Sequence, residues 1–226
     1  MKMQLYSFWR SSAAFRVRIA LNLKGLDYEV IPVHLNKNGG EQLQSEYAQK
    51  NPTRLVPLLI DDKQPIHQSL AIIEYLEEIH PNPPLLPISP IDRAWVRSLA
   101  MDIAADIHPI SNLRVLRYLV KKLEISVKDK DAWYQHWIAL GLESLEKQLY
   151  SEPRVGNFAF GNQPGLIDIC LVPQIFNACS AQMDVRPYPT LMRIFHECMK
   201  LPAFIDAAWE KQIDAQGLNP LTPPQE

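Results

Sequence analysis

The hydrophobic pattern of the first 80 residues predicts a small mixed sheet with helices packed against it. Short apolar runs bounded by polar or structure-breaking residues predict four strands, at positions 5–8, 28–34, 55–60 and 65–67. The almost unbroken apolar segment 13–23 predicts a buried helix. Residues 69–79 place apolar side chains at helical spacing and predict a second helix. Its glutamates Glu74, Glu77 and Glu78 fall on the opposite face, which is expected to be solvated.

From residue 91 onward the pattern becomes helical almost throughout. Five helices are predicted, at positions 91–121, 130–150, 166–178, 190–199 and 203–211. Pro109 should kink the first of them, because proline removes a backbone donor and clashes with the preceding turn. The stiff, proline-rich stretch 81–90 is interpreted as a linker. The chain is therefore predicted to have an α/β domain at 1–80 and an all-helical domain at 91–226.

Composition limits the classes of function. The chain has 226 residues, a formal net charge of -2, 47% hydrophobic and 21% charged residues, which argues against a dedicated binder of nucleic acid or of anionic membranes. It contains no apolar run long enough to span a membrane, and its first four residues lack the features of a signal peptide. The three cysteines show no CxxC spacing, which favours a reducing, cytoplasmic compartment without a disulfide framework.

Motifs for a metal site or for a serine-hydrolase nucleophile are missing from the sequence. The six histidines are scattered without an HxH or HxxxH pair, and there is no G-x-S-x-G motif, so no metal cofactor is expected. Asp102 and Asp106 are spaced to lie one helical turn apart. Such a pair fits a catalytic face, but more often it marks a solvated stripe or a hydrogen-bonded pair at a helix interface.

Two serines stand where the first predicted strand leads into the first predicted helix. Ser11 and Ser12 suit the N-cap, where a side-chain oxygen accepts hydrogen bonds from backbone N–H groups that lack partners. Such a point combines free N–H groups, a partial positive charge and two hydroxyls, and it can stabilise a carboxylate, a phosphate or a thiolate. Nucleotide phosphate is not expected, because no phosphate-binding glycine motif is present. A purely structural helix cap is the alternative.

Two further features point to a ligand that contains peptide groups. Pro57 follows Val56 at the entry of a predicted core strand, where proline is often cis and turns the N–H and C=O groups of the preceding residue outward. An edge-strand or bulge proline is the alternative. Gln68 and Ser69 open the second helix and form another candidate anion site. A ligand with a peptide backbone, a carboxylate and a thiol would match these features, and glutathione is such a ligand.

The residues around the serine pair resemble the signature of zeta-class glutathione transferases, the maleylacetoacetate isomerase family. That signature is Ser-Ser-Cys-x-Trp-Arg-Val-Arg-Ile-Ala-Leu, and residues 11–21 here are Ser-Ser-Ala-Ala-Phe-Arg-Val-Arg-Ile-Ala-Leu. The resemblance covers roughly residues 4–212, and its other matching segments are 23–25, 51–52, 56–57, 66–76, 112–116 and 171–174.

The resemblance implies a thioredoxin-like α/β N-terminal domain, an all-α C-terminal domain, a homodimer and glutathione as cofactor. Ser11 would stabilise the glutathione thiolate, with Ser12 as the second choice. Val56 would pair with the tripeptide backbone, and Gln68 and Ser69 would hold the γ-glutamyl carboxylate. The other residues implied to bind the cofactor are Gln42, at the glycyl end, with Ala13, Ala14, Phe15 and Arg16 from the first helix and His108, Asn112, Leu113 and Arg114 from the helical domain.

Two positions depart from the family pattern where it bears on the substrate. Ala13 replaces the signature cysteine, which leaves no sulfur beside the serines. Residues 179–180 are Cys-Ser, where many members carry an arginine thought to face the carboxylate of the substrate. Arg10 and Arg16 remain as candidate partners for that carboxylate.

The resemblance therefore implies a glutathione-dependent cis–trans isomerase of maleylacetoacetate, a step of tyrosine and phenylalanine catabolism, acting by reversible addition of a thiolate. One alternative is an enzyme that consumes glutathione, in conjugation or dehalogenation of other small electrophiles. Another is a maleylpyruvate isomerase. A third, of a different class, is a non-catalytic interaction module with the same fold, against which the intact Ser11, Gln68 and Ser69 argue.

Overall fold

The computed structural model of the chain describes residues 2–215. It divides into two compact units, the first made of residues 2–85 together with 200–215 and the second of residues 86–199. The predicted domain boundaries place residues 200–215 with the helical part, whereas here they pack within the first unit. The predicted helical domain also includes 216–226, which lie outside the described residues.

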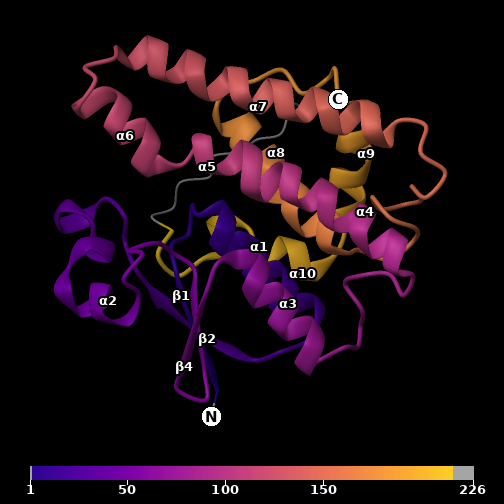
Figure 1. Ribbon diagram of the computed structural model, residues 1–226, viewed down its shortest axis with the longest axis horizontal. Helices are drawn as coiled ribbons and strands as arrows, with labels where there is room; N and C mark the ends of the chain where they lie inside the picture. The colour runs from indigo at the N-terminus through magenta and orange to yellow at the C-terminus, as the bar shows by residue number, and fades with distance from the viewer. Residues whose placement is uncertain (1, 216–226) are drawn as a thin grey trace. The chain divides into compact units, whose positions relative to one another are not determined.

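A four-stranded mixed sheet forms the centre of the first unit (Figure 1). Its strands, in the spatial order β2-β1-β3-β4, are β1 (Met3–Ser7), β2 (Tyr28–Pro32), β3 (Leu58–Asp61) and β4 (Gln64–His67). Strand β2 runs parallel to β1, and β3 is antiparallel to both β1 and β4. The four predicted strands are present, but β3 begins at Leu58, three residues later than predicted. Strand β2 lies at the edge of the sheet and ends at Pro32. An edge position suits proline, because its nitrogen carries no hydrogen to donate to a neighbouring strand.

Helices cover both faces of this sheet. The helical segments of the first unit are α1 (Ser12–Leu23), η1 (Lys37–Gly39), η2 (Glu41–Leu43), α2 (Ser45–Lys50), α3 (Ser69–Ile79), α10 (Pro202–Ile205) and η4 (Trp209–Lys211). Helices α1 and α3 pack against each other on one side of the strands, and α2 lies on the other side (Figure 1). Helix α10 packs on α1. The apolar run that predicts α1 is its buried surface: Phe15, Ile19 and Leu21 have no exposed area.

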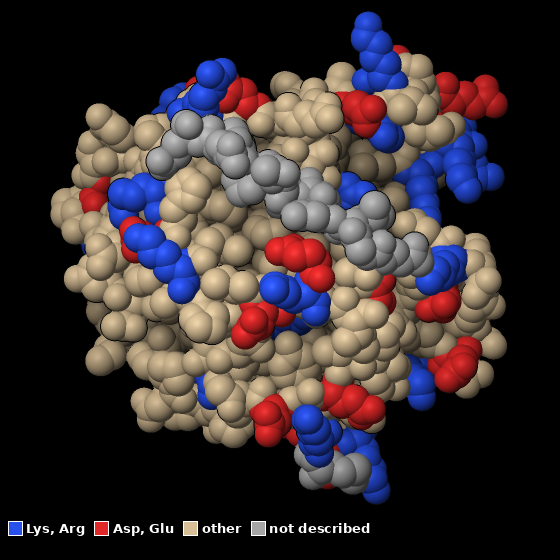
Figure 2. Space-filling view, turned by 180° about the vertical axis from the view of Figure 1, so that it is seen from behind, with Lys and Arg blue, Asp and Glu red and all other residues tan. Residues whose placement is uncertain are grey.

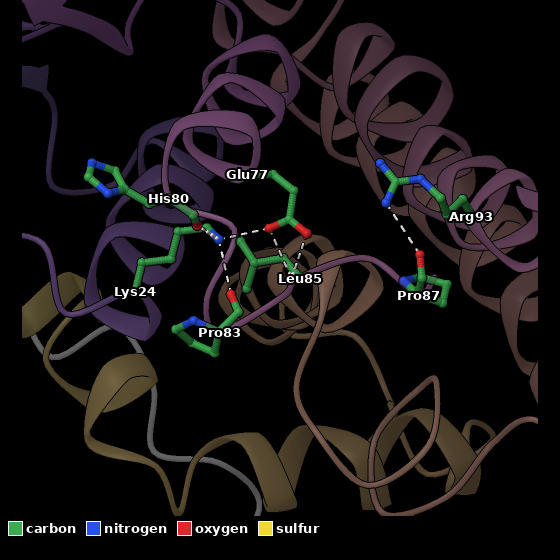
Figure 3. A network of polar contacts seen from close by, with 7 residues as sticks. All are labelled: Lys24, Glu77, His80, Pro83, Leu85, Pro87 and Arg93. Atoms are coloured by element: carbon green, nitrogen blue, oxygen red, sulfur yellow. Dashed lines mark hydrogen bonds and ion pairs between the residues drawn. The ribbon is translucent and has the colours of Figure 1, made fainter. Parts of the chain in front are cut away.

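The polar face predicted for α3 is wrong at Glu77. Its side chain is buried, and its Oε2 atom lies 2.7 Å from Nζ of Lys24 at the end of α1 (Figure 3). Both carboxylate oxygens also accept from the backbone N–H of Leu85. The chain that leaves α3 turns back over this face and covers it, a path that helical periodicity does not encode.

The second unit is helical, as predicted. Its helices are α4 (Pro90–Met101), η3 (Asp102–Ile107), α5 (His108–Ile110), α6 (Leu113–Lys121), α7 (Val127–Leu149), α8 (Leu166–Ser180) and α9 (Pro189–Cys198). Helix α8 is buried over most of its length and packs against α4, η3 and α9. On the face shown in Figure 2, acidic and basic side chains lie in small groups in which both signs occur, separated by uncharged surface, in keeping with the small net charge.

The single helix predicted over 91–121 is interrupted around Pro109 over a longer stretch than one kink. The segment η3 is a π-helix, at whose end the N–H of His108 donates to the carbonyl of Ile103, five residues back. A π turn is wider than an α turn, and it accommodates the proline ring that follows. After α5 the chain leaves helical geometry at Ser111 and restarts at Leu113.

The helix predicted over 203–211 is also interrupted, because it consists of the two short pieces α10 and η4. None of the helices within residues 2–215 combines the length and apolar character needed to cross a membrane. In that same range, no three His, Cys, Asp or Glu side chains are grouped so that they could hold a metal ion.

Candidate functional site

Ser11 is the N-cap of α1. Its backbone is extended and its Oγ atom accepts a hydrogen bond from the N–H of Ala14, at 3.2 Å. The side chain is partly exposed, whereas that of Ser12 is only 4% exposed. A hydroxyl that accepts one hydrogen bond keeps its own hydrogen to donate. Of the two serines, Ser11 is therefore the one that can donate to an anion arriving from solvent.

The next residues of α1 are less accessible than direct contact with a cofactor requires. Ala13 is half-buried, but Ala14 and Phe15 have no exposed surface. Their backbone N–H groups donate to the side chain and the carbonyl of Ser11. Neither residue can contact a ligand directly in this arrangement. Both are buried in the core and support Ser11 through these two hydrogen bonds.

Arg16 connects the two candidate anion sites. It is 1% exposed, and its Nη1 atom donates to Oγ of Ser69 at 3.2 Å. A guanidinium held beneath the surface by Ser69 supplies positive charge to the start of α3, which favours a role on the cofactor side over one with a substrate carboxylate. Arg10, the other candidate partner for the substrate, is exposed, and its guanidinium carbon lies 5.6 Å from the ring centroid of Trp209.

The start of α3 has the properties of an anion site. Its N-cap residue Gln68 makes no side-chain capping bond, so the first N–H groups of the helix are not satisfied from within it. Gln68 also has φ 70° and ψ 117°, a conformation that residues other than glycine rarely adopt. Such backbone strain is found mainly at functional sites, where the surroundings hold it in place. Ser69 follows directly, with its hydroxyl held by Arg16.

The peptide bond between Val56 and Pro57 is cis, the first of the two alternatives considered from the sequence. Two residues that the sequence analysis did not assign hold the chain just before it. The carbonyl of Leu55 accepts from the hydroxyl of Tyr47 and, at 2.8 Å, from Nδ2 of Asn51. Burial raises the pKa of Tyr47 to about 12, so this hydroxyl stays a donor at neutral pH. Asn51 lies in one of the segments that match the family, but the sequence analysis gives it no role.

Gln42 provides an independent test of whether the first unit suits glutathione. It lies in η2, is 7% exposed, and its Oε1 atom has no hydrogen-bond partner among the described residues. A buried polar atom of this kind calls for a ligand or solvent donor. Together with the uncapped start of α3, it fits a ligand that carries both N–H groups and a carboxylate.

The remaining candidates lie in the second unit, at the break between α5 and α6. His108 begins α5, and Asn112 is the N-cap of α6, where its Oδ1 atom accepts from the N–H of Arg114 at 3.1 Å. That N–H is therefore not available to the carbonyl of Ile110, four residues back. Nε1 of Trp133, on α7, donates to this carbonyl instead, at 2.9 Å. Trp133 thus holds the break between α5 and α6 against α7, a contact that no motif in the sequence indicates. Leu113, the last candidate, is the first residue of α6.

The second departure from the family pattern, residues 179–180, lies at the C-terminal end of α8. Ser180 is its last residue, and Cys179 is half-buried, with its thiol pKa raised by burial. At the other end, Asp168 accepts from the N–H of Gly165 at 2.8 Å and from that of Ala159 at 2.9 Å. Gly165 has no side chain to return the bond, so half of a reciprocal helix cap is present. Burial raises the pKa of Asp168 to about 6.

Comparison with known proteins identifies the family. The family described as "Glutathione S-transferase, N-terminal domain" matches residues 1–78. A probable maleylacetoacetate isomerase of Vibrio cholerae is 50% identical over 215 residues, which cover 95% of this chain and 99% of that protein. The chain belongs to the zeta-class glutathione transferases, the family of maleylacetoacetate isomerases. It is therefore a member of a family of enzymes, and the predicted fold class is confirmed.

Solved structures of zeta-class proteins support this assignment. A bacterial zeta-class maleylpyruvate isomerase in its holo form has a TM-score of 0.91 and 43% identity, with 94% of this chain and 99% of that chain covered. A maleylacetoacetate isomerase from Methylobacterium extorquens AM1, solved with bound malonate and glutathione, has a TM-score of 0.89 and 38% identity over 94% of this chain and 99% of that one.

Proposed function

We propose that this protein is a glutathione-dependent cis–trans isomerase of maleylacetoacetate. The observation that carries the proposal is the position of Ser11, a partly exposed hydroxyl at the start of a buried helix, in a chain half identical to a probable maleylacetoacetate isomerase. The binding of glutathione together with malonate, a small dicarboxylate, by a zeta-class relative supports the same reading.

The first contribution of the protein to the reaction would be to favour the ionised form of the glutathione thiol. When bound, glutathione supplies a thiolate that adds reversibly to the cis double bond, so that the bond rotates while single and re-forms as trans with the thiolate released. A free thiol has a pKa of roughly 8.5, so little of it is ionised at neutral pH. The hydroxyl of Ser11 and the positive end of α1 favour the ionised form. Glutathione is returned unchanged and acts as a cofactor.

The other candidate residues would bind the tripeptide. The start of α3, with Gln68 and with Ser69 backed by Arg16, suits the γ-glutamyl carboxylate. The backbone of Val56 suits the peptide groups, and the buried amide of Gln42 suits the glycyl end. Contacts from the helical part would come from His108, Asn112, Leu113 and Arg114.

The substrate is a small unsaturated dicarboxylic acid, and Arg10 is the exposed cation next to Ser11 that would hold one of its carboxylates. Maleylpyruvate is the second candidate substrate, because a maleylpyruvate isomerase has a TM-score of 0.91 to this chain. We further propose a cytoplasmic homodimer that acts in tyrosine and phenylalanine catabolism. The absence of disulfides, since all three cysteines are free, agrees with a reducing compartment.

The test is an ultraviolet assay of cis-to-trans conversion by the purified protein, with maleylacetoacetate and maleylpyruvate as alternative substrates and glutathione at a catalytic level. We expect many turnovers for each glutathione molecule, with no loss of free thiol. Loss of one glutathione per product would identify a conjugating transferase. Failure to bind glutathione in calorimetry would identify a non-catalytic module and overturn the proposal.

A further inference from the structure

The loop that presents Ser11 is held by residues about 200 positions away in the sequence. Oδ2 of Asp214 accepts a hydrogen bond from the backbone N–H of Trp9, at 3.0 Å. Both residues belong to the first compact unit. Trp9 lies between the end of β1 and the N-cap of α1, and the N–H of Ser11 closes a turn onto the carbonyl of Phe8, at 2.9 Å. Asp214 therefore fixes the middle of the turn that ends at Ser11.

The carbonyl side of the same turn is fixed by Arg18. This side chain is fully buried, and it donates to the carbonyl of Trp9 at 3.2 Å and to Oγ of Ser7 at 3.0 Å. Its Nε atom donates to the carbonyl of Ala207, at 3.0 Å. Burial lowers the pKa of Arg18 to about 10, and Asp214 opposes that shift. Arg18 thus connects the turn to the same C-terminal segment that carries Asp214.

Aromatic side chains also connect this turn to the C-terminal segment. The rings of Trp9 and Trp209 meet edge to face with centroids 6.0 Å apart, and the guanidinium of Arg10 lies over the ring of Trp209. Trp209 itself has no exposed surface. The segment 207–214 therefore contacts both residues that directly precede Ser11.

We propose that Asp214 is a positioning residue for Ser11, through which the C-terminal segment sets the place of the thiol-activating hydroxyl. The inference rests on the proposed function of Ser11. Sub-ångström placement matters here, since a misplacement of about 1 Å can cost about 100-fold in rate. Asp214 does not touch glutathione in this scheme, and it acts through the backbone of Trp9.

The negative charge of Asp214 and its hydrogen bond to the turn should shift the thiol pKa of bound glutathione in opposite directions, so the two effects can be separated by mutation. As a negative charge near the site, Asp214 disfavours a thiolate, so loss of the charge alone should lower the thiol pKa of bound glutathione. As the acceptor that holds the turn, it favours the thiolate, so loss of the acceptor should raise that pKa. Asp214→Asn removes the charge and keeps an acceptor oxygen, whereas Asp214→Leu removes both.

The experiment is a pH titration of the ultraviolet absorbance of the thiolate in the complex with glutathione, combined with kcat and KM measurements. We expect the parent protein to lower the thiol pKa, Asp214→Leu to return it toward roughly 8.5, and Asp214→Asn to leave it at or below the parent value. The value of kcat should fall by up to about 100-fold in Asp214→Leu and recover in Asp214→Asn. Glu210→Leu, an exposed acid in η4, is the matched control and should behave as the parent.

Asp214→Glu provides a second test in case Asp214→Leu does not fold. It keeps the charge but displaces the carboxylate by one methylene, and it should also raise the thiol pKa. Titrations of Asp214→Leu or Asp214→Glu that coincide with that of the parent would overturn the inference while leaving the proposed function intact. A parent protein that does not lower the thiol pKa would overturn both.

Discussion

The Nζ atom of Lys24 lies 2.7 Å from Oε2 of Glu77, in an ion pair whose lysine side chain has no exposed surface. The same Nζ donates to the carbonyls of His80, at 2.6 Å, and Pro83, at 3.0 Å. Glu77 in turn accepts from the N–H of Leu85 (Figure 3). The pair therefore joins the end of α1, the last turn of α3 and the chain that leaves α3, with every charge hydrogen-bonded.

Loss of one member of this pair should destabilise the protein strongly. In Lys24→Met the carboxylate of Glu77 would remain buried without its cation, a situation that typically costs about 3–5 kcal/mol. Lys24→Met/Glu77→Leu should lose less than the sum of the two single variants, because it leaves no buried charge. Urea denaturation of the four proteins measures both effects.

A surface pair provides the control. Lys147 and Glu143 lie 2.6 Å apart on α7, but their side chains are 72% and 58% exposed. Lys147→Met should change the free energy of unfolding by no more than about 1 kcal/mol. A similar cost for Lys24→Met would show that the buried pair contributes no more than a solvated one.

Ser11 should be essential for turnover but not for folding, and glycine is the substitution that separates the two. Glycine is tolerated as an N-cap at a cost of only a few tenths of a kcal/mol, whereas alanine costs about 1 kcal/mol. Ser11→Gly removes the hydroxyl and should lower kcat by about 100-fold or more, the usual cost of losing one donor to a developing anion. Thermal denaturation should show the fold intact.

The buried neighbour is the matched control for Ser11. Ser12→Ala should keep most of the activity, because the Ser12 side chain is almost fully covered. The reverse result, with Ser12→Ala inactive and Ser11→Gly active, would transfer the role to Ser12.

The contact between Arg16 and Ser69 should control affinity for glutathione more than rate. Arg16→Met removes the cation behind the start of α3, and Ser69→Ala removes the hydroxyl that it holds. Both should raise the KM for glutathione, by about tenfold if one charge-assisted hydrogen bond is lost. Their kcat at saturating glutathione should stay near the parent value. A loss in kcat at unchanged KM would place Arg16 with the substrate carboxylate instead.

Local rules predicted the four strands and the helices α1 and α3 of the first unit, because each of these elements is specified by neighbouring residues. The start of α1 at Ser11 is an example, since it follows from the hydrogen bond that a serine side chain makes to the backbone next to it. Glu77 was misplaced because the chain that covers it lies outside the helix. The interruption of the helix at 102–112 was foreseen at Pro109 but not in its extent, since a π turn depends on how the helix packs.

The same division holds for the candidate site. Ser11, Gln68 and Ser69 were found from local signals, a cap position and a helix start. Asp214 and Trp133 were not, because each donates to or accepts from a backbone group distant in sequence, and neither side chain belongs to a motif. A residue that acts through a single contact distant in sequence does not belong to a motif of fixed spacing, so the sequence alone does not identify it.

Asp168 should make stability fall as pH rises through the mildly acidic range. Burial raises its pKa to about 6 in the folded protein, against roughly 3.9 in an unfolded chain. Between these values the folded state binds more protons than the unfolded state, so the contribution of Asp168 is fully present below pH ~4 and decreases up to pH ~6. The loss is at most about 3 kcal/mol, from 1.36 kcal/mol per pKa unit.

Asp168→Asn isolates this contribution, because all other titrating groups are shared with the parent. The variant should be less stable, since the new amide nitrogen cannot accept one of the two bonds from Ala159 and Gly165. The difference in free energy of unfolding, measured by urea denaturation from pH 4.5 to 8, should be largest at the acidic end and constant above pH ~7. A difference that widens as the pH rises would mean that the two backbone donors outweigh burial and that the pKa of Asp168 is lowered.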